Sequence, residues 1–236
     1  MFYQSGWNTK LKRPIRSGSR SNAETQGNSG MRMKFYINIF KGLTAPFVLL
    51  MMAHFDAWGN KTAWVYLGLH GSYGAIWVLK SRFFPDKTWE RRVGWLVGVG
   101  IWGALAFYLI APLMLISRSV QNPGWYLALC ISIFIIGVFL HIASDMQKFT
   151  ALKINPENLI EDGLFKRVRN PNYLGELLIY ASMALLSLHW APFLVLGLYL
   201  VLYWIPNMLR KDRSLSRYPG FEEYKKRSKL FIPYLI

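Results

Sequence analysis

The first group of side chains able to take part in chemistry lies in the segment HIASDMQKF. His141, Ser144, Asp145 and Lys148 are separated by intervals of one, three or four residues, so a helix would place them on one face. This face joins an imidazole, a carboxylate and an ammonium where an apolar run ends. It is interpreted either as part of a ligand site or as a solvated helix end held by an Asp145–Lys148 pair.

A second group follows in NPNYLGELLIY. Pro171 suits the first turn of a helix. From there Asn172, Glu176 and Tyr180 recur every four residues and form one stripe, with Tyr173 beside them. The stripe carries an amide, a carboxylate and a phenol into an apolar segment, where polar groups are costly and therefore indicate function.

Two arginines stand directly before this helix. Arg167 and Arg169 lie near its N-terminus, where the helix dipole favours anions, and guanidinium groups bind phosphate in a bidentate manner. The pattern predicts a site for a phosphorylated or carboxylated cofactor that enters from the cytoplasm. The alternative is an interfacial anchor in which arginine and tyrosine meet lipid headgroups. Glu176 argues against it, because a lipid anchor needs no carboxylate inside the helix.

The elements that must position these groups are membrane helices. Hydrophobic residues make up 53% of the 236-residue chain and charged residues 17%, which excludes disorder for most of its length. The single cysteine, Cys130, excludes a disulfide scaffold. The net charge of +16 comes from basic residues placed between long apolar stretches. That arrangement indicates a membrane and anionic lipid headgroups, not a nucleic acid.

Six stretches are candidates to cross the bilayer, which takes roughly 20 mainly apolar residues. They cover residues 35–55, 62–79, 93–116, 125–144, 173–188 and 192–208. Basic residues gather in both tails and in the second and fourth connections, whereas the other three connections hold almost none. The positive-inside rule therefore predicts an all-α polytopic bundle of about six to seven transmembrane helices, with both termini in the cytoplasm.

The expected organisation has three parts. Residues 1–33 form a disordered basic tail, residues 34–139 form the N-terminal transmembrane helices on the substrate side, and residues 140–236 form the C-terminal cofactor-binding domain. The membrane is either a bacterial inner membrane or the endoplasmic reticulum, and we expect a monomer. The four histidines lie on different segments without metal-ligand spacing, so no metal site is predicted.

The motifs GLFKRVRNPNYLGELLIY and FEEYKKRSKLFIPYLI carry a resemblance to the C-terminal domain of the steroid 5-alpha-reductase family, over roughly residues 140–236. Members of that family are multi-helix membrane reductases that hold NADPH between their C-terminal helices and cytoplasmic loops. The resemblance implies NADPH as cofactor and hydride transfer to an activated C=C bond of a lipophilic substrate, steroid-like or another enone lipid. It places Asp145, Asn172 and Glu176 near the nicotinamide or its ribose.

The cofactor site expected on this basis draws on both groups and on the C-terminal segment. Its members are His141, Asp145, Lys148, Arg167, Arg169, Asn172, Tyr173, Glu176, Tyr180, Asn207, Lys211 and Arg227.

For the substrate, the resemblance implies a hydrogen-bond donor to a carbonyl. In the steroid enzymes a tyrosine and a glutamate of the N-terminal half polarise this group. Here LHGSYGAIWVLK offers Tyr73 as the donor and His70 as the second choice. The alternative for Tyr73 is a packed residue in a glycine-lined helix crossing. The first helix has no matching glutamate, and His54 and Asp56 are the polar candidates near it.

Two other functions compete with the reductase. Isoprenylcysteine-type and phospholipid-type membrane methyltransferases, which use S-adenosylmethionine, share the pattern formed here by Arg169, Asn170, Pro171, Tyr173 and Gly175. A non-catalytic lipid-binding membrane protein is the third possibility. Glu176 directly after the shared pattern, and the FEEYKKRSKLFIP ending, favour the reductase.

Overall fold

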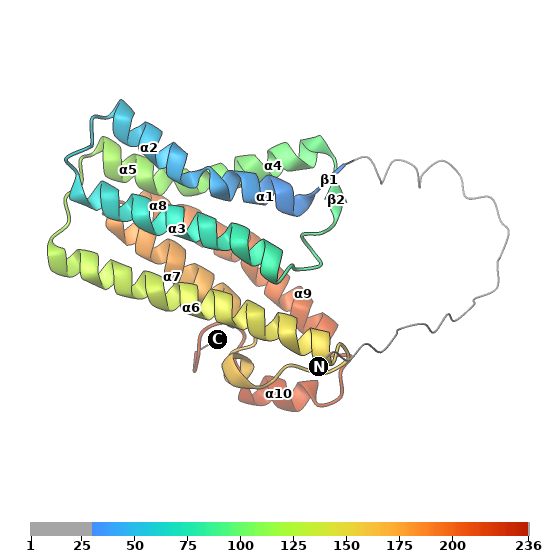
Figure 1. The fold of residues 1–236 in the computed structure, drawn as a ribbon. Helices are drawn as coiled ribbons and strands as arrows, with labels where there is room; N and C mark the ends of the chain where they lie inside the picture. Colours follow the sequence, from blue (N-terminus) through green and yellow to red (C-terminus); the bar gives the residue numbers. More distant parts are fainter. Residues whose placement is uncertain (1–29, 236) are drawn as a thin grey trace, which may run out of the picture.

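The computed structural model describes residues 30–235, and within them the predicted all-α bundle is confirmed. Six helical rods lie side by side and alternate in direction (Figure 1). The rods are α1 (Met33–Gly42) with α2 (Thr44–His54); α3 (Lys61–Phe83); α4 (Trp95–Ala106), η2 (Phe107–Leu109) and α5 (Ile110–Ser117); α6 (Gly124–Ile154); α7 (Pro171–Leu186); and α8 (Trp190–Tyr199), η4 (Leu200–Trp204) and α9 (Ile205–Leu215).

Smaller elements complete the described part of the chain. Strands β1 (Met31–Arg32) and β2 (Arg92–Val93) pair antiparallel. A short turn, η3 (Gly163–Phe165), precedes α7, and α10 (Phe221–Arg227) follows α9. Most of the predicted tail, residues 1–29, lies outside the described residues. Residue 140, the expected domain boundary, lies inside the continuous helix α6.

Four rods are long and apolar enough to cross a membrane within residues 30–235. They cover Met33–His54, Trp95–Ser117, Gly124–Ile154 and Trp190–Leu215, and most of their residues are not buried inside the protein. The other two expected spans correspond to α3 and the 16-residue α7. These two rods contact several neighbours each, α3 against α1, α2, α5, α6 and α7. Rods enclosed by protein can carry the polar side chains that lipid-facing rods avoid.

Glycines let the inner rods approach closely. A Cβ atom on Gly175 of α7 would lie 2.4 Å from the backbone nitrogen of His141 and 2.6 Å from the carbonyl of Gly137, both on α6. A Cβ atom on Gly74 of α3 would lie 2.1 Å from the carbonyl of Lys41 on α1. The backbones at these two crossings therefore touch, which brings polar side chains of four helices together.

Three rods change geometry along their length. Pro46 has no N–H to donate to the carbonyl of residue 42, and α1 ends at Gly42. The third rod contains the 3-10 turn η2, and the sixth contains the π-helical turn η4. Both η2 and η4 adjoin a stack of Tyr108 on Tyr199, whose ring centroids are 4.8 Å apart. Single π-helical turns are rare and frequently occur at functional sites.

Candidate functional site

A buried lysine lies at the meeting point of α1, α3 and α7. Lys41 is only 4% exposed, and its Nζ donates a hydrogen bond to the hydroxyl of Tyr180. The same nitrogen lies 4.5 Å from the ring centroid of Tyr73 and 5.0 Å from that of Trp77. A buried ammonium is costly unless it is compensated, and here aromatic faces and a phenol oxygen provide the compensation.

A second buried lysine organises the adjoining layer between α3 and α6. Lys80 forms an ion pair with Asp145, and its Nζ donates to Nε2 of His141 at 3.1 Å. Nδ1 of His141 lies 3.1 Å from the carbonyl oxygen of Asn172. Because a carbonyl only accepts, Nδ1 carries the hydrogen and Nε2 is the acceptor for Lys80. The imidazole is therefore neutral and ties α6 to the start of α7.

His141, Ser144, Asp145 and Lys148 all lie on the continuous helix α6. Their ion pairs, however, differ from the Asp145–Lys148 pair considered from the sequence. The alternative of an Asp145–Lys148 pair is wrong, because Asp145 binds Lys80 on α3. Lys148 instead lies 3.0 Å from the carboxylate of Asp86 in the loop before β2. Burial acts to raise the pKa of Asp86, but the ammonium of Lys148 and the N–H of Thr88 outweigh it and hold that pKa below its usual value. This pair holds the 84–91 loop against α6.

Glu176 is a second carboxylate on which Lys41 and Lys80 act, beside Asp145. It is half-buried on α7 and forms no ion pair with any residue in the described range 30–235. Lys41 and Lys80 nevertheless act on it electrostatically. The side chain of Asn172, one turn earlier, makes no hydrogen bond to a described residue. The expected stripe of Asn172, Glu176 and Tyr180 therefore faces the cluster of Lys41 and Lys80, where Tyr180 accepts from Lys41 and Glu176 lies beside Tyr73.

The two predicted substrate-side residues are both buried in α3. Tyr73 packs against the rings of Tyr180 and His141, with centroids 5.9 and 6.1 Å away. Its hydroxyl is buried and makes no hydrogen bond of full geometry to a described residue, but it lies close enough to interact with the carboxylate of Glu176 and the hydroxyl of Tyr180. His70 lies one turn earlier, where its Nδ1 is 3.1 Å from the hydroxyl of Tyr66. Tyr73 thus belongs to the cluster, whereas His70 belongs to a separate pair beside it.

Arg169 is held inside the protein. Its Nε and Nη2 bind the carboxylate of Asp212 on α9, at 2.9–3.1 Å. Its Nη1 donates to the carbonyl oxygen of Ser228 at 2.7 Å. Lys211 donates to the carbonyl of Arg169 at 2.8 Å and to Oδ1 of Asn170 at 3.1 Å. The guanidinium therefore connects the start of α7 with α9 and the C-terminal segment.

The remaining predicted cations lie nearer the surface. Arg167 is exposed and lies 5.8 Å from the ring centroid of Tyr234. Arg227 is exposed and forms an ion pair with Glu161. Both stand at the end of the bundle that carries the connection 155–170 and α10 (Figure 1). Neither arginine is therefore part of the cluster around Lys41 and Lys80.

Two other predicted residues link α7 with the last rod. The ring centroid of Tyr173 lies 5.9 Å from that of Trp204 in η4. Asn207 on α9 accepts a hydrogen bond at 3.0 Å from Arg210. These side chains lie where α7 meets the last rod, and neither forms a hydrogen bond or ion pair with Lys80 or Asp145.

The C-terminal segment is anchored by a neutral phenol. Burial raises the pKa of Tyr224 to about 12, so at neutral pH its hydroxyl is protonated and donates to the carbonyl of Phe165 at 2.7 Å. The backbone N–H of Arg169 donates to the carbonyl of Lys229 at 2.8 Å, next to the bridge between Val168 and Lys229. The segment after α9 therefore packs against the connection that precedes α7.

Sequence reasoning missed both lysines as site residues. Neither Lys41 nor Lys80 is among the candidate site residues predicted from the sequence. The available signal was a charge inside an apolar run, which is rare and usually functional. The first rod thus contributes a lysine to the cluster where a glutamate was sought. His54 and Asp56 are exposed at the opposite end of the bundle.

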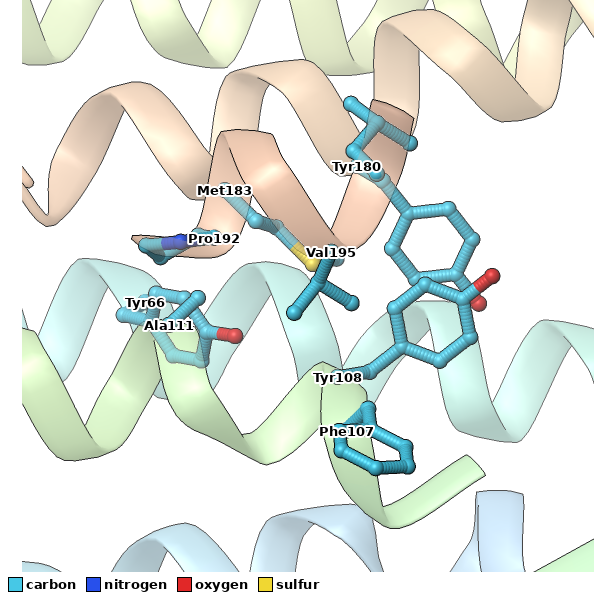
Figure 2. Close-up of a pocket in the computed structure, with 9 residues that line it drawn as sticks. Tyr66, Phe107, Tyr108, Ala111, Tyr180, Met183, Pro192 and Val195 are labelled. Carbon is cyan, nitrogen blue, oxygen red and sulfur yellow. The ribbon is translucent and has the colours of Figure 1, made fainter. Parts of the chain in front are cut away.

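A pocket adjoins the cluster on the side of η2, α5 and α8 (Figure 2). Figure 2 shows the ring of Tyr108 against the ring of Tyr180, with centroids 3.9 Å apart and planes 9° from parallel. Most of the lining is apolar. The lining residues are Tyr66, Phe107, Tyr108, Ala111, Tyr180, Met183, Pro192, Val195 and Leu196.

Paired charges enclosed by a bundle of apolar helices define a polytopic membrane protein with a polar interior. More specifically, the chain belongs to the family described as protein of unknown function (DUF1295), which matches residues 86–228 and includes steroid 5-alpha-reductase-like proteins. The predicted family resemblance is therefore confirmed.

Two curated relatives match parts of the chain. Steroid 5-alpha-reductase DET2 of Arabidopsis thaliana is 28% identical over 119 residues, which are 47% of this chain and 42% of that protein. An uncharacterized protein of Schizosaccharomyces pombe is 33% identical over 67 residues, 28% of this chain and 24% of that protein. The matches thus span less than half the length of either relative.

Proposed function

We propose that the protein is a membrane-embedded reductase that uses NADPH to reduce an activated C=C bond of a lipophilic substrate. The observation that carries the proposal is the half-buried carboxylate of Glu176, which has no ion-pair partner among the described residues and faces Lys41 and Lys80. It lies in the segment whose sequence resembles the NADPH-holding helix of steroid 5-alpha-reductases. Similarity to DET2 supports the same reaction class.

The residues present fit the chemistry of this cofactor. A nicotinamide carboxamide both donates and accepts hydrogen bonds. Glu176 can accept from it, and Asn172 can do both. The phosphates need cations, and Lys211, Arg167 and Arg227 lie at the same end of α7 as Asn172. Arg169 would serve indirectly, since its donors already bind Asp212 and Ser228.

NADPH, when bound, would supply the hydride. The chain would supply orientation and electrostatics. The Lys80–His141 layer holds the start of α7 through the carbonyl of Asn172. A buried phenol, for which Tyr73 was predicted, would donate a hydrogen bond to the substrate carbonyl. Lys41 would stabilise negative charge that develops on its oxygen. The surrounding helices exclude water, which strengthens both effects.

The methyltransferase alternative loses support from the geometry of its shared pattern. Arg169 binds Asp212, and Nδ2 of Asn170 donates to the carbonyl of Leu230 at 2.9 Å. Gly175 permits the close crossing with α6. Packing within the protein therefore accounts for these positions without a methyl donor.

The proposal is tested by thermal unfolding of the detergent-purified protein with NADPH or S-adenosylmethionine. A ligand that binds only the folded state raises the unfolding temperature, and we expect NADPH alone to do so. Glu176→Gln and Asn172→Ala should remove most of this increase. Glu157→Gln, on an exposed residue of the 155–170 connection, should keep it.

Three outcomes would contradict the proposal. Stabilisation by S-adenosylmethionine alone would indicate a methyltransferase. Stabilisation by neither compound, in a protein that unfolds cooperatively, would indicate a lipid-binding protein. An unchanged NADPH effect in both Glu176→Gln and Asn172→Ala would refute the assigned cofactor stripe.

A further inference from the structure

We propose that a polar hollow between α1, α3 and the 84–91 loop binds a hydroxyl of the polyol headgroup of an anionic phospholipid, such as phosphatidylglycerol. The hollow has a volume of about 20 Å³, which admits a polar group the size of a water molecule. The site is separate from the cofactor stripe on α7 and does not depend on the proposed reaction. Its polar lining residues are Lys34, Asn38, Lys80, Ser81, Asp86 and Glu90.

The lining contains a buried acceptor that lacks a donor. Nδ2 of Asn38 donates to Oγ of Ser81 at 2.7 Å, and this hydroxyl donates to the carbonyl of Val78 at 2.8 Å. Because the hydrogen of Ser81 is already used, Asn38 must be the donor of the first bond, which fixes the orientation of its amide. Oδ1 of Asn38 is then buried without a partner among residues 30–235. Buried polar atoms are nearly always hydrogen-bonded, so this atom calls for a ligand that donates.

The charges around the hollow favour a neutral donor over an ion. Two cations and two carboxylates line it, and each is already part of an ion pair. The pairs are Lys34–Glu90, Lys80–Asp145 and Lys148–Asp86. An added ammonium or phosphate would therefore lose its hydration without meeting an unpaired opposite charge. A hydroxyl costs less to desolvate, and it can donate to Asn38 while it accepts from another group.

Two cations beside the hollow are suited to the phosphate of the same lipid. Arg82 follows Ser81 in α3, and Lys87 follows Asp86 in the loop. Both side chains are exposed, and neither forms an ion pair with a residue in the described part of the chain. Guanidinium groups bind phosphate in a bidentate manner, and lysine binds it as a point charge. An anionic phosphodiester that carries a hydroxyl group would therefore satisfy both the hollow and these cations.

Exposed apolar side chains next to the lining indicate that the ligand is a lipid. Phe35 of α1 is 46% exposed and Phe83 of α3 is 69% exposed, and each adjoins a lining residue in the sequence. Ile39 and Leu79, four residues further along each helix, are exposed as well. The two helices lie side by side, and the 84–91 loop continues from the end of α3 (Figure 1). Acyl chains can thus lie along α1 and α3 while the headgroup reaches the loop.

Native mass spectrometry of the detergent-purified protein tests this site by measuring which lipids remain bound. Phosphatidylglycerol, phosphatidic acid and phosphatidylcholine with different acyl masses but equal chain classes are added in equal amounts. Phosphatidic acid keeps the anionic phosphate without the polyol, and phosphatidylcholine has a headgroup that cannot donate. We expect about two- to tenfold more bound phosphatidylglycerol than phosphatidic acid, the ratio that one net hydrogen bond gives. Phosphatidylcholine should bind least.

Variants separate the hydroxyl site from the phosphate site. Asn38→Leu should remove the preference for phosphatidylglycerol over phosphatidic acid, while both still bind more than phosphatidylcholine. Arg82→Gln combined with Lys87→Gln should lower both anionic lipids to the level of phosphatidylcholine. The matched control combines Lys225→Gln with Lys226→Gln, on exposed residues of α10, and should keep the wild-type pattern. The comparison of lipids on the wild-type protein keeps the proposal falsifiable if Asn38→Leu folds poorly.

Equal binding of phosphatidylglycerol and phosphatidic acid to the wild-type protein would overturn the proposal, because charge alone would explain it. So would an unchanged preference in a folded Asn38→Leu variant. Displacement of phosphatidylglycerol by NADPH would also overturn it and would assign the hollow to a ribose hydroxyl of the cofactor. Selective lipid binding by a protein that NADPH does not stabilise would support the lipid site while the proposed function fails.

Discussion

Single side chains in this protein show two ways of keeping a lysine inside a membrane bundle. Lys80 is neutralised by the carboxylate of Asp145. Lys41 has no carboxylate within ion-pair distance among the described residues and is surrounded by tyrosine and tryptophan rings. The first arrangement stabilises a structural pair, whereas the second leaves positive charge beside a phenol. That difference is why the proposed function places Lys41, and not Lys80, beside the substrate carbonyl.

At the same scale, Arg169 gives a prediction that separates structure from cofactor binding. Arg169→Met would leave the buried carboxylate of Asp212 uncompensated, and breaking one partner of such a pair costs about 3 kcal/mol. The unfolding temperature without ligand should therefore fall, and Asp212→Asn should lower it too. Arg213→Met, on an exposed neighbour in α9, should leave it unchanged. Wild-type stability with weakened NADPH binding would instead assign Arg169 to the phosphates.

Much of the site could be predicted at the level of one helix. The spacing from His141 to Lys148 and from Asn172 to Tyr180 specifies each face by itself, and Pro171 begins α7 as expected. The ion-pair partners could not be predicted, because they depend on which rods become neighbours. Lys80 reaches Asp145 only because α3 packs on α6. The irregular turns η2 and η4 also lack a clear local signal.

The crossing of α6 and α7 gives the prediction that belongs to whole elements. Gly175→Ala places a methyl group 2.4 Å from the backbone nitrogen of His141. Because the nearest atoms belong to the backbone of α6, a side-chain rotation cannot relieve this clash. The helices must separate, and overpacking of this kind costs about 1–3 kcal/mol. Thermal unfolding of the detergent-purified protein should show the loss.

The matched control for this crossing is Gly197→Ala on α8, where a Cβ atom meets nothing within 4 Å. Alanine favours a helix over glycine by about 1 kcal/mol, so this variant should be as stable as the wild type or slightly more stable. Equal stability of the two variants would show that the α6–α7 contact is looser than described.

The molecule as a whole is polarised along its rods. The short sheet, the 84–91 loop and the connection 155–170 lie at one end, and the turns 55–60, 118–123 and 187–189 lie at the other (Figure 1). The first end includes Lys87, Arg91, Lys166 and Arg167. The turns at the other end contain Arg118 as their single lysine or arginine. This asymmetry agrees with six rods that alternate in direction, because alternate connections then lie at the same end of the bundle.

The positive-inside rule assigns the basic end to the cytoplasm, and labelling can check that orientation. In a Cys130→Ala background, which removes the one native thiol, Glu157→Cys marks the basic end and Gln121→Cys the other; both positions are exposed. In intact cells a membrane-impermeant maleimide should label Gln121→Cys directly and Glu157→Cys only after permeabilisation. The reverse pattern would place the cofactor stripe on the side where cytoplasmic NADPH is absent and would exclude the proposed reaction. The expected pattern would bring the stripe to the compartment that supplies reduced nicotinamide.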